Sequence, residues 1–275
     1  MSQQSNSQQA KPTTAKKQGF LPQVVIPILL LIGIGFYMFV CGNGANFEGG
    51  SNANHPLPGN YLGMIYKGGF IVPLLFTLFL TVLVFSIERF LTINKASGNG
   101  SIDDFVRKVK YCLETNDVDG AISACDKQQG SVANVVRASL EKYKQMQTDT
   151  SMDKEQKVLA IRKEIEEATS LELPMLEKNL SILATIAPVG TLVALLGTVL
   201  GMIRAFSALG ASGQTDATAL SQGISEALIN TALGIGTSAL AIVMYNIFTT
   251  KIDKLTYGID EAGFSIAETF NSKHK

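Results

Sequence analysis

The sequence has few charged residues. Asp, Glu, Lys and Arg together make up 17% of its 275 residues, and the mean hydropathy is positive. Because so few charged residues cannot cover the surface of a large soluble protein, the composition indicates a membrane protein. The 23 basic and 23 acidic residues balance at a formal net charge of zero. No overall basic field therefore indicates a nucleic-acid partner.

Cysteine and histidine are also scarce. Cys41, Cys112 and Cys125 form an odd set with no C-x-x-C pair, which predicts neither a disulfide framework nor a zinc site. His55 lies in a Pro/Gly-rich stretch and His274 near the end of the chain, and neither has ligand-like neighbours at helical spacing. Neither a G-x-S-x-G nor an H-E-x-x-H motif occurs. We therefore expect no metal, no cofactor and no catalytic residues.

Long apolar stretches are present instead. A helix needs about 20 mostly apolar residues to cross a bilayer, and four stretches meet or nearly meet this length: 20–41, 69–90, 180–206 and 223–248. The first is also short enough for the apolar region of a signal peptide. The residues that follow it, CGNGANF, contain no A-x-A-like cleavage site, so we favour an uncleaved span.

Lysine and arginine near the span ends predict the orientation, because positive loops stay on the cytoplasmic side. The loop 207–222 contains neither residue. We therefore expect 42–68 and 207–222 on the periplasmic side, and both termini with 91–179 in the cytoplasm. The basic residues that indicate this are Lys11, Lys16 and Lys17 before the first span, Arg89 and Lys95 after the second, and Lys251 and Lys254 after the last.

The stretch 91–179 has helical periodicity throughout. An apolar stripe with nearly coiled-coil spacing runs directly into the third span, with Pro174 as the only break. This predicts one long bent helix that associates with copies of itself. We expect residues 1–19 to be a disordered tail and 249–275 a cytoplasmic C-terminal tail. The stripe consists of Val158, Ile161, Ile165, Ala168, Leu171 and Met175.

The predicted fold class is thus an all-α integral membrane protein. Three core transmembrane helices are joined by an extra N-terminal one, and long helices extend into a cytoplasmic helical bundle.

Glu226 is an ionisable residue inside the last span. A carboxylate at the bilayer centre costs about 2.5–3.5 kcal/mol on insertion scales, so such groups usually face a bundle interior or a water-filled cavity. Asn230 lies on the same helical face, with Gly234 and Ser238 one and two turns further on. The alternative is a side chain that extends to the nearby outer interface. We interpret Arg204 and Asp216 as solvated charges at that interface.

The third span carries a matching face. Thr191 and Thr198 are seven residues apart, and Gly197 with Gly201 forms a G-x-x-x-G pair. Two such polar helix faces, together with one carboxyl group, predict a narrow polar path between the two spans. Taken singly, the small and hydroxyl residues are more typical of helix packing than of an ion path.

Three sequence segments together resemble the MotA/TolQ/ExbB proton-channel family, and its ExbB branch most closely. They are LATIAPVGTLVALLGTVLGMIRAF, GISEALINTALG and YNIF. The resemblance implies a homopentamer in the bacterial inner membrane around a dimer of a single-span ExbD-like protein with an essential aspartate. A TonB-like protein would carry force to outer-membrane receptors.

By position, the resemblance assigns the family's pore glutamate to Glu226 and its two pathway threonines to Thr198 and Thr231. We expect Thr191, Asn230 and Ser238 to line the pore as well. Helix packing is expected of Gly197, Gly201 and Gly234. The sequence departs from the family at Leu240, where relatives often have proline, and in its extra first span.

Other interpretations remain open at this point. A TolQ-like role in envelope maintenance fits the same motifs, and a carboxyl with hydroxyls can coordinate sodium instead of passing protons. A non-conducting scaffold is a further alternative, although an anchor has no need for Glu226. An intramembrane enzyme would need a second catalytic partner, which neither helix supplies.

Overall fold

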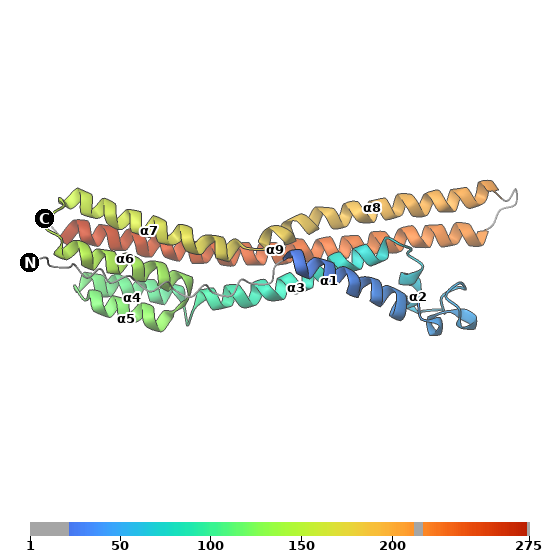
Figure 1. Ribbon diagram of the computed structural model, residues 1–275, viewed down its shortest axis with the longest axis horizontal. Coiled ribbons are helices and arrows are strands. Elements are labelled where there is room, and N and C mark those ends of the chain that lie inside the picture. The colour runs from blue at the N-terminus through green and yellow to red at the C-terminus, as the bar shows by residue number, and fades with distance from the viewer. Residues whose placement is uncertain (1–21, 212–216, 274–275) are drawn as a thin grey trace, which may run out of the picture.

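The computed structural model describes residues 22–211 and 217–273, and these form an elongated helical molecule (Figure 1). The predicted tail 1–19, Asp216 and His274 lie outside the described residues. Within the described ranges the only β-structure is an isolated bridge between Phe47 and Pro56. The main helices are α1 (Pro22–Gly35), α2 (Tyr61–Tyr66), α3 (Val72–Ser97), α4 (Ile102–Glu114), α5 (Val118–Gln128), α6 (Gly130–Thr148), α7 (Lys154–Glu177), α8 (Leu180–Ala211) and α9 (Ala217–Lys273).

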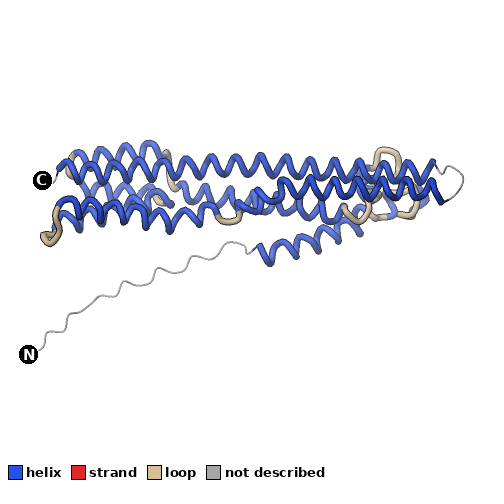
Figure 2. The backbone as a smooth tube through the Cα atoms, turned by 90° about the horizontal axis from the view of Figure 1, so that it is seen from above, coloured by secondary structure: helices blue, strands red, loops and turns tan. Residues whose placement is uncertain are grey.

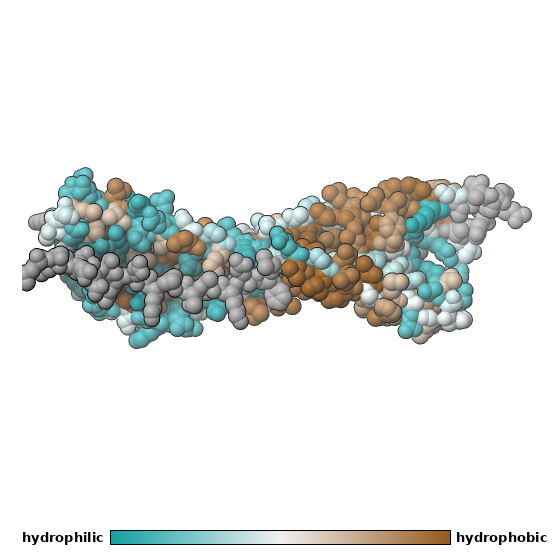
Figure 3. Space-filling view, in the orientation of Figure 1, coloured by the Kyte–Doolittle hydropathy of each residue, from teal (hydrophilic) through white to brown (hydrophobic). Residues whose placement is uncertain are grey.

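Four helical segments are long and apolar enough to cross a membrane: Pro22–Cys41, Val72–Glu114, Lys154–Ser207 and Leu220–Lys273. Their apolar parts gather in one half of the molecule, where Figure 3 shows a brown band with polar residues on both sides. Apolar side chains exposed in such a band match a hydrocarbon environment. The protein is therefore an all-α membrane protein, as its sequence predicts.

The other half is a helical bundle formed by α4, α5, α6, α7 and the second half of α9 (Figures 1 and 2). Side-chain caps stabilise the N-termini of two of its helices. The Ser101 side chain accepts from the Asp104 backbone amide at the start of α4, and Asp153 forms a capping box with Gln156 at the start of α7. In the core, the rings of Tyr143 and Phe270 meet edge to face at 5.0 Å.

Helix α9 is continuous for 57 residues. The prediction of a C-terminal tail at 249–275 is wrong, because this part of α9 buries Ile259, Ile266 and Phe270 in the bundle core. It continues the helix without interruption through Leu240, where relatives often have proline. One helix thus connects the membrane half of the molecule to the bundle.

The predicted single bent helix is two helices. The break falls after Pro174, at Lys178 and Asn179, and Asn179 has φ +62°, a left-handed conformation that asparagine tolerates better than most residues. At the C-terminal end of the predicted stripe, Leu171 is 78% exposed and Met175 48% exposed in the single chain.

Two residues of α3 hold this break in place. The buried Arg89 guanidinium donates to the carbonyl oxygens of Met175 at 3.4 Å and Leu176 at 3.2 Å, which are near the end of α7. It also pairs with Glu88 at 2.5 Å, and Asn179 Nδ2 donates to the same carboxylate at 3.4 Å. Terminal carbonyls without helical partners are thereby satisfied.

Residues 42–71, predicted as a loop over 42–68, fold into an ordered structure that we call the cap segment. It contains the short helices η2 (Gly44–Asn46), η3 (Glu48–Gly50) and α2, and it follows a π-helical turn, η1 (Phe36–Cys41). The Asn46 amide donates to the carbonyls of Val40 and Cys41 at 2.7 and 3.1 Å. These bonds fix the segment to the end of the first span.

Candidate ion pathway between α8 and α9

The Glu226 side chain is buried and ion-paired. Its Oε1 accepts from Arg204 Nη1 at 2.6 Å, with 9% of the glutamate side chain and 50% of the arginine side chain exposed. The Arg204 guanidinium also lies over the Phe70 ring, 5.4 Å from its centroid. The interpretation of Arg204 as a solvated interface charge is therefore wrong: the antiparallel course of α8 and α9 brings it to the carboxylate.

The cap segment covers this ion pair. A Cβ at Gly69 would overlap Oε1 of Glu226, and Gly69 has φ +82°, which side-chain-bearing residues rarely adopt. Next to it, Asn230 Nδ2 donates to the Gly68 carbonyl at 3.0 Å. Asn230 is thus fully buried against the cap segment, and its Oδ1 has no partner among the described residues.

A cleft of about 370 Å³ adjoins the pair. Tyr66, Lys67 and Gln222 line it together with Arg204 and Glu226. Lys67 and Gln222 also border a smaller cavity of about 120 Å³ beside His55. Lys67 Nζ donates to the carbonyls of Asn52 and Ala53 at 3.0 and 3.1 Å, and partial burial lowers the pKa of its amine. Polar groups therefore lead from the cap segment to Glu226.

Hydroxyl pairs continue from Glu226 along the contact between α8 and α9. Thr198 Oγ1 and Thr231 Oγ1 lie 2.7 Å apart. One layer deeper, Thr191 donates to Ser238 Oγ at 3.0 Å. The two layers are seven residues apart on each helix, as expected for antiparallel neighbours that keep one contact face. Four of the predicted pathway residues thus meet in two bonded pairs, while Asn230 points to Gly68 instead.

The three predicted packing glycines all lie where α8 and α9 approach closely. A Cβ at Gly197 would come within 2.8 Å of Asn230 Cβ, and one at Gly201 within 2.9 Å of the Gly223 carbonyl oxygen. At Gly234 it would overlap the Ala194 side chain. Larger residues at these positions would separate the helices and the hydroxyl pairs.

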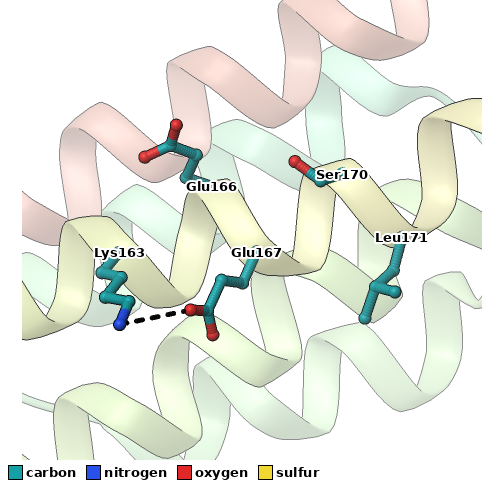
Figure 4. A pocket seen from close by; sticks show the side chains of 5 residues that line it. All are labelled: Lys163, Glu166, Glu167, Ser170 and Leu171. Atoms are coloured by element: carbon teal, nitrogen blue, oxygen red, sulfur yellow. Dashed lines mark ion pairs between the residues drawn. The ribbon is translucent and has the colours of Figure 1, made fainter.

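A further hollow lies in the helical bundle, far along the chain from Glu226. Figure 4 shows that its five lining side chains all come from α7, with Lys163 and Glu167 pointing toward one another. Their ion pair spans 3.5 Å and is exposed. A surface made by one helix encloses no ligand, so we do not assign it a function.

Comparison with known proteins gives the family. The profile described as the MotA/TolQ/ExbB proton channel family matches residues 127–261. Over 86 residues the chain is 38% identical to the ExbB-like 3 biopolymer transport protein of Synechocystis sp., covering 30% of this chain and 41% of that one. Over 81 residues it is 42% identical to the biopolymer transport protein ExbB of Helicobacter pylori, covering 30% and 56%.

A third relative belongs to another branch. The Tol-Pal system protein TolQ of Pseudomonas aeruginosa is 29% identical over 124 residues, covering 45% of this chain and 54% of that one. The chain thus spans about half the length of the curated relatives it matches.

Residues 127–261 of the chain thus match the MotA/TolQ/ExbB proton channel family, and the relatives named ExbB and TolQ support the same family. The family is described as a proton channel, which is a transport component and not an enzyme class. With its four apolar helices, the chain is a multi-pass inner-membrane protein.

The sequence analysis missed the surroundings of Glu226. Arg204 and Glu226 flank the short connection between two antiparallel spans, so their closeness could have been predicted from the sequence. The contact with Gly69 had no such signal, because 157 positions separate it from Glu226 in the sequence.

Proposed function

We propose that the chain is an ExbB-like subunit of an ion-driven motor. Five copies surround a dimer of a single-span ExbD-like protein in the inner membrane, with both termini in the cytoplasm. The motor energises TonB-dependent transport across the outer membrane through a TonB-like protein. The proposed pathway residues are Glu226, Thr198 and Thr231, with Thr191 and Ser238 beyond them.

The observation that carries this proposal is the buried carboxyl above two bonded hydroxyl pairs. Glu226 lies in the contact between two apolar helices, and a structural anchor gains nothing from an ionisable group there. Hydroxyl groups both donate and accept, so Thr198 with Thr231 and Thr191 with Ser238 can hold water or relay a proton. Moving one charge through 100 mV releases about 2.3 kcal/mol, so several ions are needed for each mechanical event.

Self-association is supported by apolar side chains that are exposed outside the apolar half. Leu159 and Leu171 on α7 and Tyr257 and Phe264 on α9 are each at least 68% exposed. Neighbouring copies would cover this surface, since large exposed apolar groups in a solvated bundle mark contacts with other chains.

The test is energised uptake by cells that carry Glu226→Ala. We expect uptake to be lost while the oligomer, measured by cross-linking, still assembles. Leu228→Ala is the control, because Leu228 is 65% exposed on the same turn of α9. Normal uptake by the Glu226 variant would reject the pathway, and replacing sodium with potassium in the assay distinguishes the two ions.

A TolQ-like role in envelope maintenance is the second candidate. Its support is the match to TolQ, which covers more of this chain than the two ExbB matches above. Rescue of a tolQ-deficient strain, but not of an exbB-deficient one, would favour it.

A further inference from the structure

A second cleft, of about 380 Å³, lies at the opposite end of the α8–α9 contact from Glu226. It lies where α8 begins and where α9 leaves the apolar half for the bundle. Its polar lining comes from the end of α7, the first turns of α8 and the middle of α9. The polar residues are Glu177, Ser181, Tyr245, Thr249 and Asp253, and Ala184 lies beside them in the lining.

The helix register connects this cleft to the hydroxyl pairs. The layer after Thr191 and Ser238 falls seven residues back on α8 and seven forward on α9, at Ala184 and Tyr245. Both residues line the cleft. At about 1.5 Å per residue, each layer adds roughly 10 Å along the helices. The face that carries the two hydroxyl pairs therefore leads into the cleft.

The charges of the cleft are of one sign. Its two ionisable carboxyl groups belong to Glu177 and Asp253, and no lysine or arginine lines it. Neither carboxylate forms an ion pair with any residue in the part of the chain that the structure describes. Lys251, two positions before Asp253, turns away to Asn94 at 3.4 Å and to the face of the Phe90 ring. A recess whose only charged lining groups are carboxylates concentrates cations.

One hydroxyl in the cleft is also unused. Thr249 Oγ1 is buried and has no hydrogen-bond partner among the described residues. A buried polar atom of this kind usually bonds to water or an ion. The Thr249 hydroxyl is thus a free hydrogen-bonding group beside the recess.

We infer that this cleft is the cytoplasmic mouth of the pathway. Glu177 and Asp253 attract or receive a monovalent cation there, either a hydrated proton or sodium, and Tyr245 and Thr249 connect the mouth to the Thr191–Ser238 pair. The inference rests on the proposed function, and it adds the end of the pathway that Glu226 does not reach.

The first test measures water access and does not depend on conduction. Single cysteines are placed at Ala184 and Tyr245 in a chain whose three native cysteines are replaced, and inverted vesicles are treated with a membrane-impermeant thiol reagent. We expect these positions to react at least ten times faster than the control variants Thr185→Cys and Val243→Cys. The controls lie within two residues, and Thr185 faces the apolar groove beside α1. Equal rates would overturn the inference.

The second test measures ion flux in reconstituted vesicles. Glu177→Gln with Asp253→Asn should lower the flux several-fold at low ionic strength and much less at high ionic strength, because electrostatic concentration is screened by salt. Glu166→Gln with Glu167→Gln removes the same charge from α7 at the hollow of Figure 4 and should leave the flux unchanged.

The two tests fail in different ways. Unchanged flux in the Glu177/Asp253 variant overturns the inference that this cleft is the mouth of the pathway. If the unmodified chain carries no flux when it is reconstituted together with its ExbD-like partner, the proposed function is rejected, while the labelling pattern still decides whether the cleft is open to water. Repeating the flux assay with and without sodium separates protons from sodium.

Discussion

Arg204 Nη1 lies 2.6 Å from Oε1 of Glu226, joining the outer ends of α8 and α9 by an ion pair beneath Gly69. The pair gives the buried carboxylate a cation from the outer end of α8. Any ion that reaches Glu226 must therefore compete with the arginine. This makes Arg204 as informative a site for mutation as Glu226.

Removing the arginine should weaken the fold. Arg204→Ala leaves a buried carboxylate unpaired, and because Arg204 is half exposed we expect a loss of about 1–3 kcal/mol, below the value for a fully buried pair. Arg204→Lys should recover part of it. Thermal unfolding in detergent gives the measurement, with Lys163→Ala as control because its pair with Glu167 is exposed. Equal unfolding temperatures for both alanine variants would contradict a structural role for the pair.

The two threonines should matter more for ion movement than for stability. Each hydroxyl also donates within its own helix, Thr198 to the Ala194 carbonyl and Thr231 to the Ala227 carbonyl, both at 3.0 Å. Valine has the same shape, so Thr198→Val and Thr231→Val should each cost about 1 kcal/mol or less.

Their ion-driven uptake should nevertheless fall clearly below that of Thr185→Val, whose hydroxyl bonds only to the Ser181 carbonyl. Two variants with full uptake would assign these hydroxyls to helix packing.

The cap segment can be tested at one glycine. Gly69→Ala introduces both an overlap with Glu226 and an unfavourable positive φ, which alone costs about 1–3 kcal/mol. Gly236→Ala is the matched control, because a Cβ there has no neighbour within 4 Å and its helix gains up to about 1 kcal/mol. Measured unfolding temperatures should move in opposite directions. An unchanged unfolding temperature for Gly69→Ala would mean that the cap segment moves aside readily.

Arg89 should be the most sensitive of the charged residues. Its side chain is 2% exposed and that of Glu88 is 14%, so Arg89→Ala should cost about 3–5 kcal/mol by leaving a buried charge and the α7 carbonyls without partners. Arg107→Ala, which removes an exposed pair with Asp104, should have a much smaller effect, because solvent screens exposed ion pairs. Chemical unfolding of the two variants gives the comparison, and a small effect at Arg89 would mean that water replaces it at the break.

Cys125 predicts a pH dependence. Burial, with a smaller contribution from Asp126, raises the pKa of its thiol to about 12, against about 8.5 in an unfolded chain. A raised pKa means that the folded state favours the protonated thiol. This stabilisation is complete below about pH 8.5 and is lost as the pH rises toward 12.

Alkylation at pH 8.5 checks whether the folded state keeps this thiol buried and protonated. In a chain with Cys41 and Cys112 replaced, folded protein should react with iodoacetamide many times more slowly than unfolded protein. Similar rates would show that Cys125 is exposed to reagent through local opening.

The sequence predicted what depends on composition and short spacing. Apolar length predicted the four spans, and the seven-residue spacing of Thr191 and Thr198 placed them on one face. The sequence alone could not predict the break at Asn179, because the left-handed backbone conformation there depends on contacts with Arg89 and Glu88 of another helix. Likewise, Asn230 was assigned to the pathway from helical position alone, whereas its amide bonds to Gly68. The C-terminal residues looked like a tail because their apolar partners lie in α4 and α6.

The uninterrupted course of α9 couples events that take place far apart. At about 1.5 Å per residue its 57 residues measure roughly 85 Å, and roughly 66 Å of this length separates Glu226 from Phe270 in the bundle core. A helix without a hinge cannot shift at one end and stay still at the other. A rearrangement of α9 around the Glu226 carboxylate must therefore also displace the side chains of α9 that are packed in the bundle.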